Sequence, residues 1–526
     1  MRDFFYKLKP HLFWIVLGGI ICAALAIRVY HIDLRPLHND EGVNYFFFKD
    51  VRSEGYYKYS HENYHGPSYF YLSTFLTGPN VFGDSELGVR SSAIIAGIFL
   101  ILLLIPLRRY EGKCFVLLAA TLVAFSSSLV FYSRYAIHET LFLVAGAWLA
   151  FSLYGWWRSG KVSTIYQIGM AAALLIATKE TFIITLFCVG LAFLSLGGYR
   201  KSFYKMQQQW QHILASLLLM SFIIVLIFTG GFRWMGGLRE MFLAVPQWVG
   251  RNTSDVGHFK SFWYYCEMLF GPEPRELMAN LFDLDLGEKI HLKTVTRTEF
   301  QLVLIVIIPL IGFLLKYGRR VFAKFTTIRS STSDRCPLGD TSFFRFCLVW
   351  GLSALLVYSY VDYKTPWLVI NITYPLIIAL AWLLAQVVKV KGVAIGSLCI
   401  IPAILISIFL TWKYNFKYPY GDKNPYSYTH TSQGMIDIVE MIDNYRKKVP
   451  NPRILIGVGS YWPLPYYLRH YSVLGYEHTK EPEKRKNSYD VMIVDSKISW
   501  KDPEWSGRYR RLSDVQEAHV YFKNVR

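Results

Sequence analysis

The chain has 526 residues, of which 53% are hydrophobic, 17% aromatic and only 18% charged. Apolar runs of about 18–20 residues recur along it, each long enough to cross a hydrocarbon core of roughly 30 Å, and a water-soluble core has no need of them. The net charge of +19 does not indicate a nucleic-acid partner, because Lys and Arg of the apolar region lie mostly in short loops between the runs. The composition therefore predicts a polytopic α-helical membrane protein.

The first apolar run, 12–29, follows Arg2, Lys7 and Lys9 and in this respect resembles a signal peptide. No small-residue cleavage site follows it, and it is long for such a signal, so we expect a retained transmembrane helix. We predict about eleven spans, at residues 12–29, 88–107, 114–131, 140–157, 163–178, 181–197, 212–230, 299–316, 343–360, 367–388 and 393–411. The stretch Ser68 to Thr77 is too short to span, which predicts an interfacial or re-entrant helix.

Lys and Arg concentrate in alternate loops, on the side of the membrane that also carries the basic N-terminus. The positive-inside rule assigns that side to the cytoplasm, in a multi-pass protein of the plasma (inner) membrane. The opposite side then carries two long loops, the chain after residue 411 and three short turns, namely 30–87, 231–298, 412–526, 132–139, 178–180 and 361–366. Polar residues gather in these outer segments, which predicts an extracytoplasmic site.

The last part of the chain, 412–526, differs in pattern from the transmembrane domain, 1–411. Ile436 to Tyr445 has the pattern of an amphipathic helix, whereas the segments Arg453-Ile-Leu-Ile-Gly-Val458 and Val491-Met-Ile-Val-Asp495 have that of short buried strands. Alternation of helix and strand predicts a small α/β domain that is large enough to hold a core. Because it follows the last span, we expect this domain and the C-terminus on the periplasmic side.

The most informative polar motif, His38-Asn39-Asp40-Glu41-Gly42, follows the first span. Two adjacent carboxylates flanked by histidines can supply a general base and a contact to a ligand or substrate. The pattern is equally consistent with a helix start, in which Asn39 or Asp40 is the N-cap and Glu41 lies in the first turn, where the helix dipole favours it. The motif alone does not decide between these alternatives.

Other outer segments carry polar residues of the same kind, and we predict that they share one cavity with the motif. Each group alone is more often a snorkelling or salt-bridged pair, but their position on one face favours a common site. A polyprenyl-phosphate sugar would need cations at its phosphate and a base at the acceptor hydroxyl, and Asp40 is the natural candidate for that base. The candidate phosphate ligands are Arg134, Lys179, Lys364 and Arg90, and the candidate substrate contacts are His61, His65, His138, Glu180 and Tyr466.

No cofactor is certain from the sequence, but a divalent metal is an open alternative. His38 and Asp40, with His61 and His65, could converge on zinc or manganese. Their spacing matches no ligand motif, and histidines at a membrane edge are commonly just hydrogen-bonded. Aromatic residues of the tail, among them Tyr428, Trp462 and Tyr466, suit either stacking on sugar rings or packing of the tail on the membrane domain, and we favour packing.

The sequence also resembles a known family. Asp40-Glu41, Gly66-Pro-Ser-Tyr69, Gly83-Asp-Ser-Glu-Leu-Gly-Val-Arg90 and Ser133-Arg-Tyr-Ala136 resemble motifs of the GT-C glycosyltransferases, in particular the protein O-mannosyltransferase and aminoarabinose transferase group. Four further segments resemble a prokaryotic subfamily named for an archaeal flippase-activity-associated protein of the N-glycosylation pathway, namely Ala177-Thr-Lys-Glu180, Lys364-Thr-Pro-Trp367, Asn424-Pro-Tyr-Ser-Tyr-Thr-His-Thr431 and Trp462-Pro-Leu-Pro-Tyr-Tyr-Leu-Arg469.

The resemblance covers nearly the whole chain and implies a GT-C fold. It also implies inverting transfer of a sugar from dolichyl- or undecaprenyl-phosphate, with Asp40 as catalytic base and Glu41 contacting a substrate. The acceptor does not follow from it, so a hydroxyl of a glycan, lipid or protein remains open. The rival hypotheses are a lipid-linked sugar flippase or its accessory, and a glycan-binding membrane protein without turnover. The helix centres are almost free of charge, which gives the flippase little support.

Overall fold

The structure is a computed structural model. It describes residues 10–63, 65–254, 259–270, 302, 340–472, 474–477, 481–498 and 500–524. The predicted span 299–316 and most of the second half of the predicted loop 231–298 lie outside the described residues.

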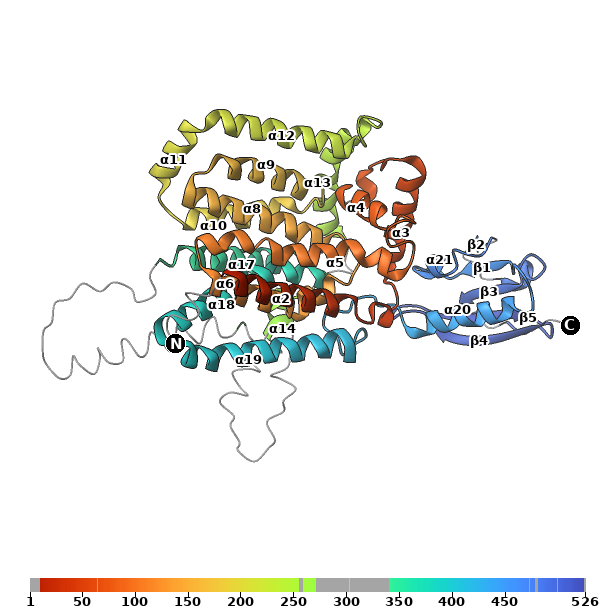
Figure 1. Cartoon of the computed structure of the whole chain (residues 1–526). Helices are drawn as coiled ribbons and strands as arrows, with labels where there is room; N and C mark the ends of the chain where they lie inside the picture. Colours follow the sequence, from red (N-terminus) through yellow and green to blue (C-terminus); the bar gives the residue numbers. More distant parts are fainter. Residues whose placement is uncertain are drawn as a thin grey trace, which may run out of the picture.

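Long helices lie side by side in one bundle, and a small α/β domain sits at one end of it (Figure 1). Within the described ranges, seven helical segments are long and apolar enough to cross a membrane, and they contain the helices α2 (Pro10–Val29), α5 (Glu86–Leu102), α8 (Glu139–Ser159), α12 (Trp210–Phe228), α17 (Ser342–Tyr360), α18 (Val369–Lys391) and α19 (Val393–Trp412). Two shorter apolar helices, α6 (Lys113–Ala124) and α9 (Val162–Ile176), accompany them. A further apolar helix, α10 (Phe182–Ser195), is followed after a 113° bend by α11 (Tyr199–Gln208). The predicted helical bundle is confirmed.

The predicted span 114–131 is not continuous, because it divides into α6 and α7 (Ser127–Tyr132). Ser126 lies at the break in an extended conformation, and its hydroxyl accepts a hydrogen bond from the Leu129 backbone N–H. A serine side chain satisfies the free N–H groups of a new helix and competes with the continuation of an old one. The bundle is centred on α18, whose membrane-crossing part is buried from end to end.

The outer segment between the first two spans forms two helices, α3 (Asn39–Glu54) and α4 (Ser68–Leu76). The predicted short helix at 68–77 is therefore present, and its side chains Tyr69 and Phe70 are buried against α3. Two other helices, α13 (Gly236–Ser254) and α14 (Tyr264–Phe270), follow α12. Short 3-10 or π turns connect the elements at Ile32–Leu34, His61–Asn63, Ile105–Arg109, Pro366–Leu368, Lys413–Lys417 and Pro482–Arg485.

The tail is a single mixed sheet with helix α20 (Gln433–Arg446) and the short helix α21 (Leu464–Tyr467). Its strands are β1 (Ile454–Gly457), β2 (Leu474–Tyr476), β3 (Val491–Asp495), β4 (Trp505–Arg511) and β5 (Glu517–Lys523), in the order β2-β1-β3-β5-β4. The first three neighbours are parallel, and β5 pairs antiparallel with both β3 and β4. The predicted helix and the two predicted strands are confirmed, whereas β2, β4 and β5 were not predicted.

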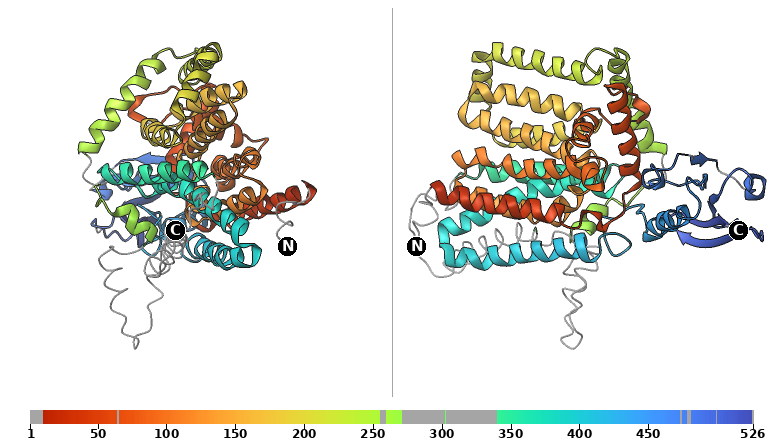
Figure 2. Two further views of the ribbon diagram at one scale, coloured as in Figure 1. Left: turned by 90° about the vertical axis from the view of Figure 1, so that its left-hand side faces the viewer. Right: turned by 45° about the vertical axis from the view of Figure 1, so that its right-hand side comes forward.

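The tail is docked directly on the outer helices α3 and α5 (Figure 2). The hydroxyl of Tyr467 accepts from the Leu37 backbone N–H at 2.7 Å and donates to Glu86 at 2.8 Å. At Gly42, a Cβ atom would lie 2.5 Å from the Cβ of Pro463, so only glycine allows α3 to approach the tail this closely. The tail therefore forms a wall over the end of the helical bundle.

Candidate functional site

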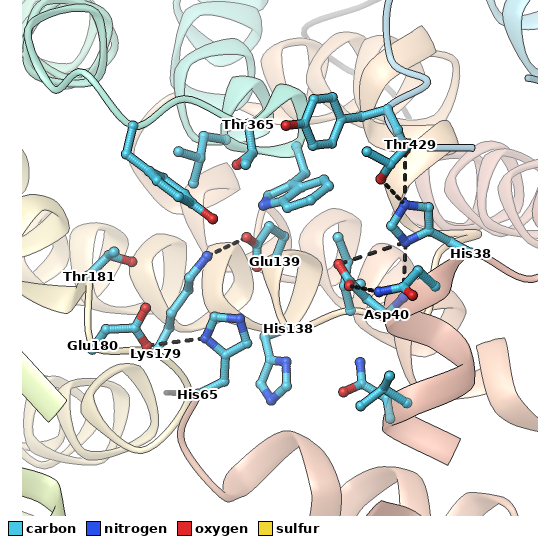
Figure 3. A pocket seen from close by; sticks show the side chains of 18 of the residues that line it. His38, Asp40, His65, His138, Glu139, Lys179, Glu180, Thr181, Thr365 and Thr429 are labelled. Carbon is cyan, nitrogen blue, oxygen red and sulfur yellow. Dashed lines mark hydrogen bonds and ion pairs between the residues drawn. The ribbon is translucent and has the colours of Figure 1, made fainter. Parts of the chain in front are cut away.

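A cavity of about 580 Å³ lies where the bundle meets the tail. Its polar lining comes from the start of α3, the segment before α4, the start of α8, the turn between α9 and α10, and the tail (Figure 3). These elements contribute His38, Asp40, His65, His138, Glu139, Lys179, Glu180, Tyr428, Thr429, Ser460, Trp462 and Ser513. Another part of the wall is apolar, with Ile184 of α10 and Leu368 at the start of α18. The cavity thus combines ionisable groups with a hydrophobic side that faces the bundle.

Glu41 lies beneath the cavity floor rather than in it. Its carboxylate is fully buried and accepts hydrogen bonds from Arg90 Nε and Nη2, both at 2.8 Å. The backbone N–H groups of His38 and Ala136 donate to the same carboxylate, also at 2.8 Å. Burial by itself would raise the pKa of Glu41, but the charge and hydrogen bonds of Arg90 outweigh it and lower the pKa to about 2. Glu41 therefore joins three segments of the chain around the start of α3.

His38 is the N-cap of α3, a position that the sequence assigned to Asn39 or Asp40. Its Nδ1 atom accepts from the Asp40 backbone N–H at 3.1 Å, and its Nε2 atom lies 2.9 Å from the carbonyl oxygen of Tyr428. A ring nitrogen that accepts an N–H cannot carry a proton, so the proton is on Nε2 and points to that carbonyl. Both nitrogens are thereby occupied, and the alternative of His38 as a metal ligand does not fit this geometry.

Asp40 projects from the first turn of α3 into the cavity. Its side chain is 40% exposed, and the amide of Asn39 donates to Oδ1 at 3.2 Å. Among the ion pairs of the described residues, its nearest positively chargeable group is His38 Nδ1 at 3.7 Å, which is the accepting nitrogen. Asp40 is thus a carboxylate that faces the cavity and has most of its hydrogen-bonding capacity free for a bound molecule.

The opposite wall holds two coupled pairs. Lys179 Nζ donates to Glu139 at 2.5 Å, and His65 Nδ1 lies 3.2 Å from Glu180 (Figure 3). Burial by itself would raise the pKa of Glu180, but His65 and then Lys179 outweigh it and lower the pKa overall. The neighbouring His138 is neutral, because burial first and then the charges of His65 and Lys179 hold its pKa well below the ordinary range. The wall therefore presents the ammonium of Lys179 and the imidazole of His65 beside the carboxylates of Glu139 and Glu180.

Three of the four cations predicted to hold a phosphate lie outside the cavity. Arg90 is occupied by Glu41 and by backbone carbonyls. Arg134 donates to the carbonyls of Ile27 and His31, and Lys364 Nζ donates to those of Lys260 and Val361. These buried side chains satisfy backbone oxygens at the ends of helices and turns, which only a folded structure reveals. Of the predicted cations, the structure brings Lys179 alone to the cavity.

Two of the predicted substrate contacts also lie elsewhere. His61 pairs with Glu240 of α13. Tyr466 is buried, and its hydroxyl donates to the carbonyl of Asp84 at 2.9 Å while its ring packs edge-on against Tyr45. Tyr466 therefore holds the tail on the bundle, as the packing interpretation predicted for the tail aromatics. His65, His138 and Glu180 do line the cavity.

The structure adds Glu139 and Trp367 to the site, and it brings in Trp462, which the sequence indicated as a candidate either for stacking on sugar rings or for packing. Glu139 stands beside Lys179, and the cavity is also lined by Trp367, in the 3-10 turn before α18, and by Trp462 of the tail. In sequence, Glu139 is only the last residue of a polar turn, and its partner is 40 positions away. No sequence pattern predicts that these two residues pair. The two Trp residues, in contrast, belong to segments that resemble motifs of the flippase-associated subfamily.

The predicted metal ligands do not converge. In the part of the chain that the structure describes, no three His, Cys, Asp or Glu side chains are placed to hold one metal ion. His61 is engaged with Glu240 outside the cavity, whereas His65 is engaged with Glu180 on the wall opposite His38 and Asp40 (Figure 3). The proposed ligand set of these histidines with Asp40 is therefore not supported by the geometry.

Comparison with known proteins gives matches in fold and in part of the sequence. Residues 64–228 match the sequence model of the family described as dolichyl-phosphate-mannose-protein mannosyltransferase. ArnT from Cupriavidus metallidurans, solved bound to undecaprenyl phosphate, superposes with a TM-score of 0.55 at 11% identity, over 97% of this chain and 98% of that one. The chain therefore has the GT-C fold. Its several apolar spans make it a multi-pass membrane protein.

Two other GT-C structures extend this result. ArnT from the same organism in its apo state gives a TM-score of 0.56 at 13% identity, over 97% of both chains. An oligosaccharyltransferase from Archaeoglobus fulgidus, in complex with zinc and sulfate, gives 0.50 at 14% identity, over 91% of this chain and 68% of that one. No curated protein matches the sequence. The GT-C fold is thus established over nearly the whole chain, whereas the flippase-associated subfamily stays a prediction.

Proposed function

We propose that this GT-C protein transfers a sugar from a polyprenyl-phosphate carrier to an acceptor hydroxyl, with inversion, in the cavity between bundle and tail. The observation that carries the proposal is that one cavity holds an acidic group, a basic group and an apolar wall. Asp40 offers a carboxylate to the cavity on one wall, Lys179 offers an ammonium on the other, and apolar side chains of the bundle such as Ile184 and Leu368 line the same space. A lipid-linked phosphate needs the last two features, and an attacking hydroxyl needs the first.

The phosphate is assigned to the wall of Lys179 and His65. An ammonium has three N–H donors, of which Glu139 takes one, so two remain for phosphate oxygens. Placing this charge where the phosphate leaves stabilises the transition state without transferring a proton to the leaving group. ArnT from Cupriavidus metallidurans was solved with undecaprenyl phosphate, which supports a polyprenyl carrier for a chain of the same fold.

Asp40 is assigned as the base. As the acceptor oxygen attacks the anomeric carbon, the carbon–oxygen bond to the phosphate breaks and the hydroxyl proton passes to a carboxylate oxygen of Asp40. Attack from the face opposite the leaving phosphate gives inversion. The Asp40 and Lys179 walls face each other across the cavity (Figure 3), which suits a base and a leaving group on opposite sides of one sugar. Glu41 acts only through α3, by fixing the position of Asp40.

The site is assigned to the extracytoplasmic face. The tail, which lines the cavity, lies at the end of the bundle remote from the start of α2 (Figure 1). Arg108 and Arg109, in the 3-10 turn after α5, and Arg158, in the last turn of α8, lie at the far ends of these helices. The positive-inside rule favours the cytoplasm for those turns. A reporter that is active only in the cytoplasm, fused after residue 526, is expected to be silent, and a strong signal would reverse the assigned orientation.

The flippase hypothesis is not favoured, because the cavity residues stay at one end of the bundle. A direct test separates the two activities. Purified protein is incubated with radiolabelled polyprenyl-phosphate sugar and a cell-envelope extract, and both label transfer and release of polyprenyl phosphate are followed. Transfer coupled to one equivalent of released carrier is expected. Movement of the carrier across vesicles without transfer would instead establish a flippase.

A further inference from the structure

A row of aromatic rings leads away from the Asp40 cavity across the tail. Trp462, in the loop after β1, lines the cavity and packs against Phe46 of α3, with ring centroids 5.4 Å apart. Tyr461 stands next to Trp462 at 5.7 Å, and Tyr476 at the end of β2 stands next to Tyr461 at 5.5 Å. The row thus begins inside the candidate active site and ends on the outer edge strand of the sheet.

The ring at the far end of the row is the most exposed of the three. Trp462 and Tyr461 are half-buried, and Tyr476 is 49% exposed. Aromatic residues at the surface of a small domain normally bury their rings in its core, so a connected, partly exposed row marks a surface for a ligand. The position of the row supports this interpretation, because the loops after parallel strands are the usual ligand edge of an α/β sheet.

From this row we infer that the acceptor is a glycan chain, whose sugar units next to the reacting one lie on Trp462, Tyr461 and Tyr476. A pyranose ring has an apolar face of C–H groups that covers an aromatic ring, while its hydroxyls point sideways to polar partners. The centroid spacing of 5.5–5.7 Å is comparable to the length of one sugar unit. The inference rests on the proposed function, because it names the acceptor of the same site.

The polar groups beside the row fit this occupant. Ser460 and Ser513 line the cavity at the tail, together with Thr429, and hydroxyls of this kind exchange hydrogen bonds with sugar hydroxyls in either direction. The loop that carries Ser460 and Trp462 is fixed by Gln516, which accepts from the Ser460 backbone N–H at 3.4 Å. An extended peptide could instead pair with the edge strand β2, but that mode would leave the rings without a stacking partner.

The test compares three fractions of a cell-envelope extract as acceptors: a polysaccharide fraction freed of lipid and protein, a protein fraction and a lipid extract. The full-length wild type is expected to label the polysaccharide fraction, and the label is expected to resist protease and organic extraction. Label in the protein or lipid fraction alone would overturn the glycan assignment and leave the transferase intact. No transfer to any fraction would instead count against the proposed function.

Variants then locate the acceptor on the row. Tyr476→Ala, and Tyr461→Leu with its apolar packing kept, are each expected to raise KM for the polysaccharide about fivefold or more at similar kcat. Tyr509→Ala is the matched control, since Tyr509 lies on β4 at the other edge of the sheet and is 48% exposed. Saturation-transfer NMR of the polysaccharide with the same variants gives an independent readout of binding. Equal KM values and equal NMR responses for Tyr476→Ala and the control would refute binding of the glycan along the row of aromatic rings.

Discussion

Arg90 of α5 and Glu41 of α3 form a fully buried ion pair with two hydrogen bonds of 2.8 Å. The same carboxylate caps the start of α3, and Asp40 is its immediate neighbour in the chain. Adjacent acidic residues thus have separate positions: Asp40 faces the cavity, and Glu41 holds the helix that presents it. The sequence allows two interpretations of this motif, a catalytic pair and a helix start. The structure shows a helix start in which Asp40 faces the cavity.

Loss of the Glu41 charge is expected to destabilise the protein strongly. Glu41→Gln removes the carboxylate closest to the buried Arg90 and leaves only Glu86, 3.5 Å away. Breaking one partner of a buried pair costs about 3–5 kcal/mol. Glu477→Gln, which breaks the exposed pair with Arg485, is the control and is expected to cost less than about 1 kcal/mol. Thermal unfolding in detergent measures both, and similar melting temperatures for the two variants would contradict the anchoring role.

The same residue predicts a pH dependence of stability. Because the pKa of Glu41 is lowered from 4.5 to about 2 on folding, its contribution is complete above pH 4.5 and disappears as the pH falls toward 2. The stability difference between the wild type and Glu41→Gln is therefore expected to shrink over this window. Melting temperatures measured from pH 7 downward test this, and two curves that remain parallel in acid would show that Glu41 keeps an ordinary pKa.

The contact between α3 and the tail is sensitive to a single methyl group. In Gly42→Ala the new Cβ would meet Pro463 at 2.5 Å, so the tail must shift, at a cost of about 1–3 kcal/mol for overpacking. We expect reduced transfer and faster proteolytic release of the tail. Gly18→Ala in α2 is the control, since nothing lies within 4 Å of its Cβ position. Unchanged activity and proteolysis in Gly42→Ala would mean that the tail does not form the cavity wall.

Lys179 is expected to govern donor binding and turnover. Removing one charge-assisted contact to a developing negative charge typically costs about 10²–10³-fold in rate. Lys179→Gln should therefore lose activity by this order and bind the labelled donor more weakly, whereas Lys49→Gln, an exposed lysine of α3, should match the wild type. Filter binding of polyprenyl-phosphate sugar gives the affinity. If Arg134→Gln weakened donor binding more than Lys179→Gln did, the phosphate would have to be placed outside this cavity.

The sequence predicts those elements whose hydrophobicity differs strongly from that of the flanking residues. Apolar runs give the bundle, and the buried strands β1 and β3 are short apolar runs of their own. Strand β4 escapes prediction because Trp505–Arg511 is largely exposed and rich in arginine, and β2 has only three residues. Both depend on their neighbours in the sheet rather than on their own pattern.

The sequence predicted which segments form the site, but not which side chains pair with one another there. Charged residues in outer turns indicated a shared cavity, and Asp40, His65, His138, Lys179 and Glu180 do meet there. The sequence could not separate Lys179 from Arg134 or Lys364, because each lies in an outer turn and each is a cation. These cations differ in whether backbone carbonyls already accept their hydrogen bonds. Such carbonyls belong to residues more than 100 positions away in the chain.

The role of Asp40 as base is the central claim, and the variant Asp40→Asn tests it most directly. The amide keeps the shape of the side chain but cannot accept the proton, so transfer of labelled sugar by the purified protein is expected to fall about 10²–10⁴-fold. Donor binding and the melting temperature should stay at wild-type values, and Asp50→Asn, on the exposed side of the same helix, should transfer normally. Transfer by Asp40→Asn at the wild-type rate would contradict the account.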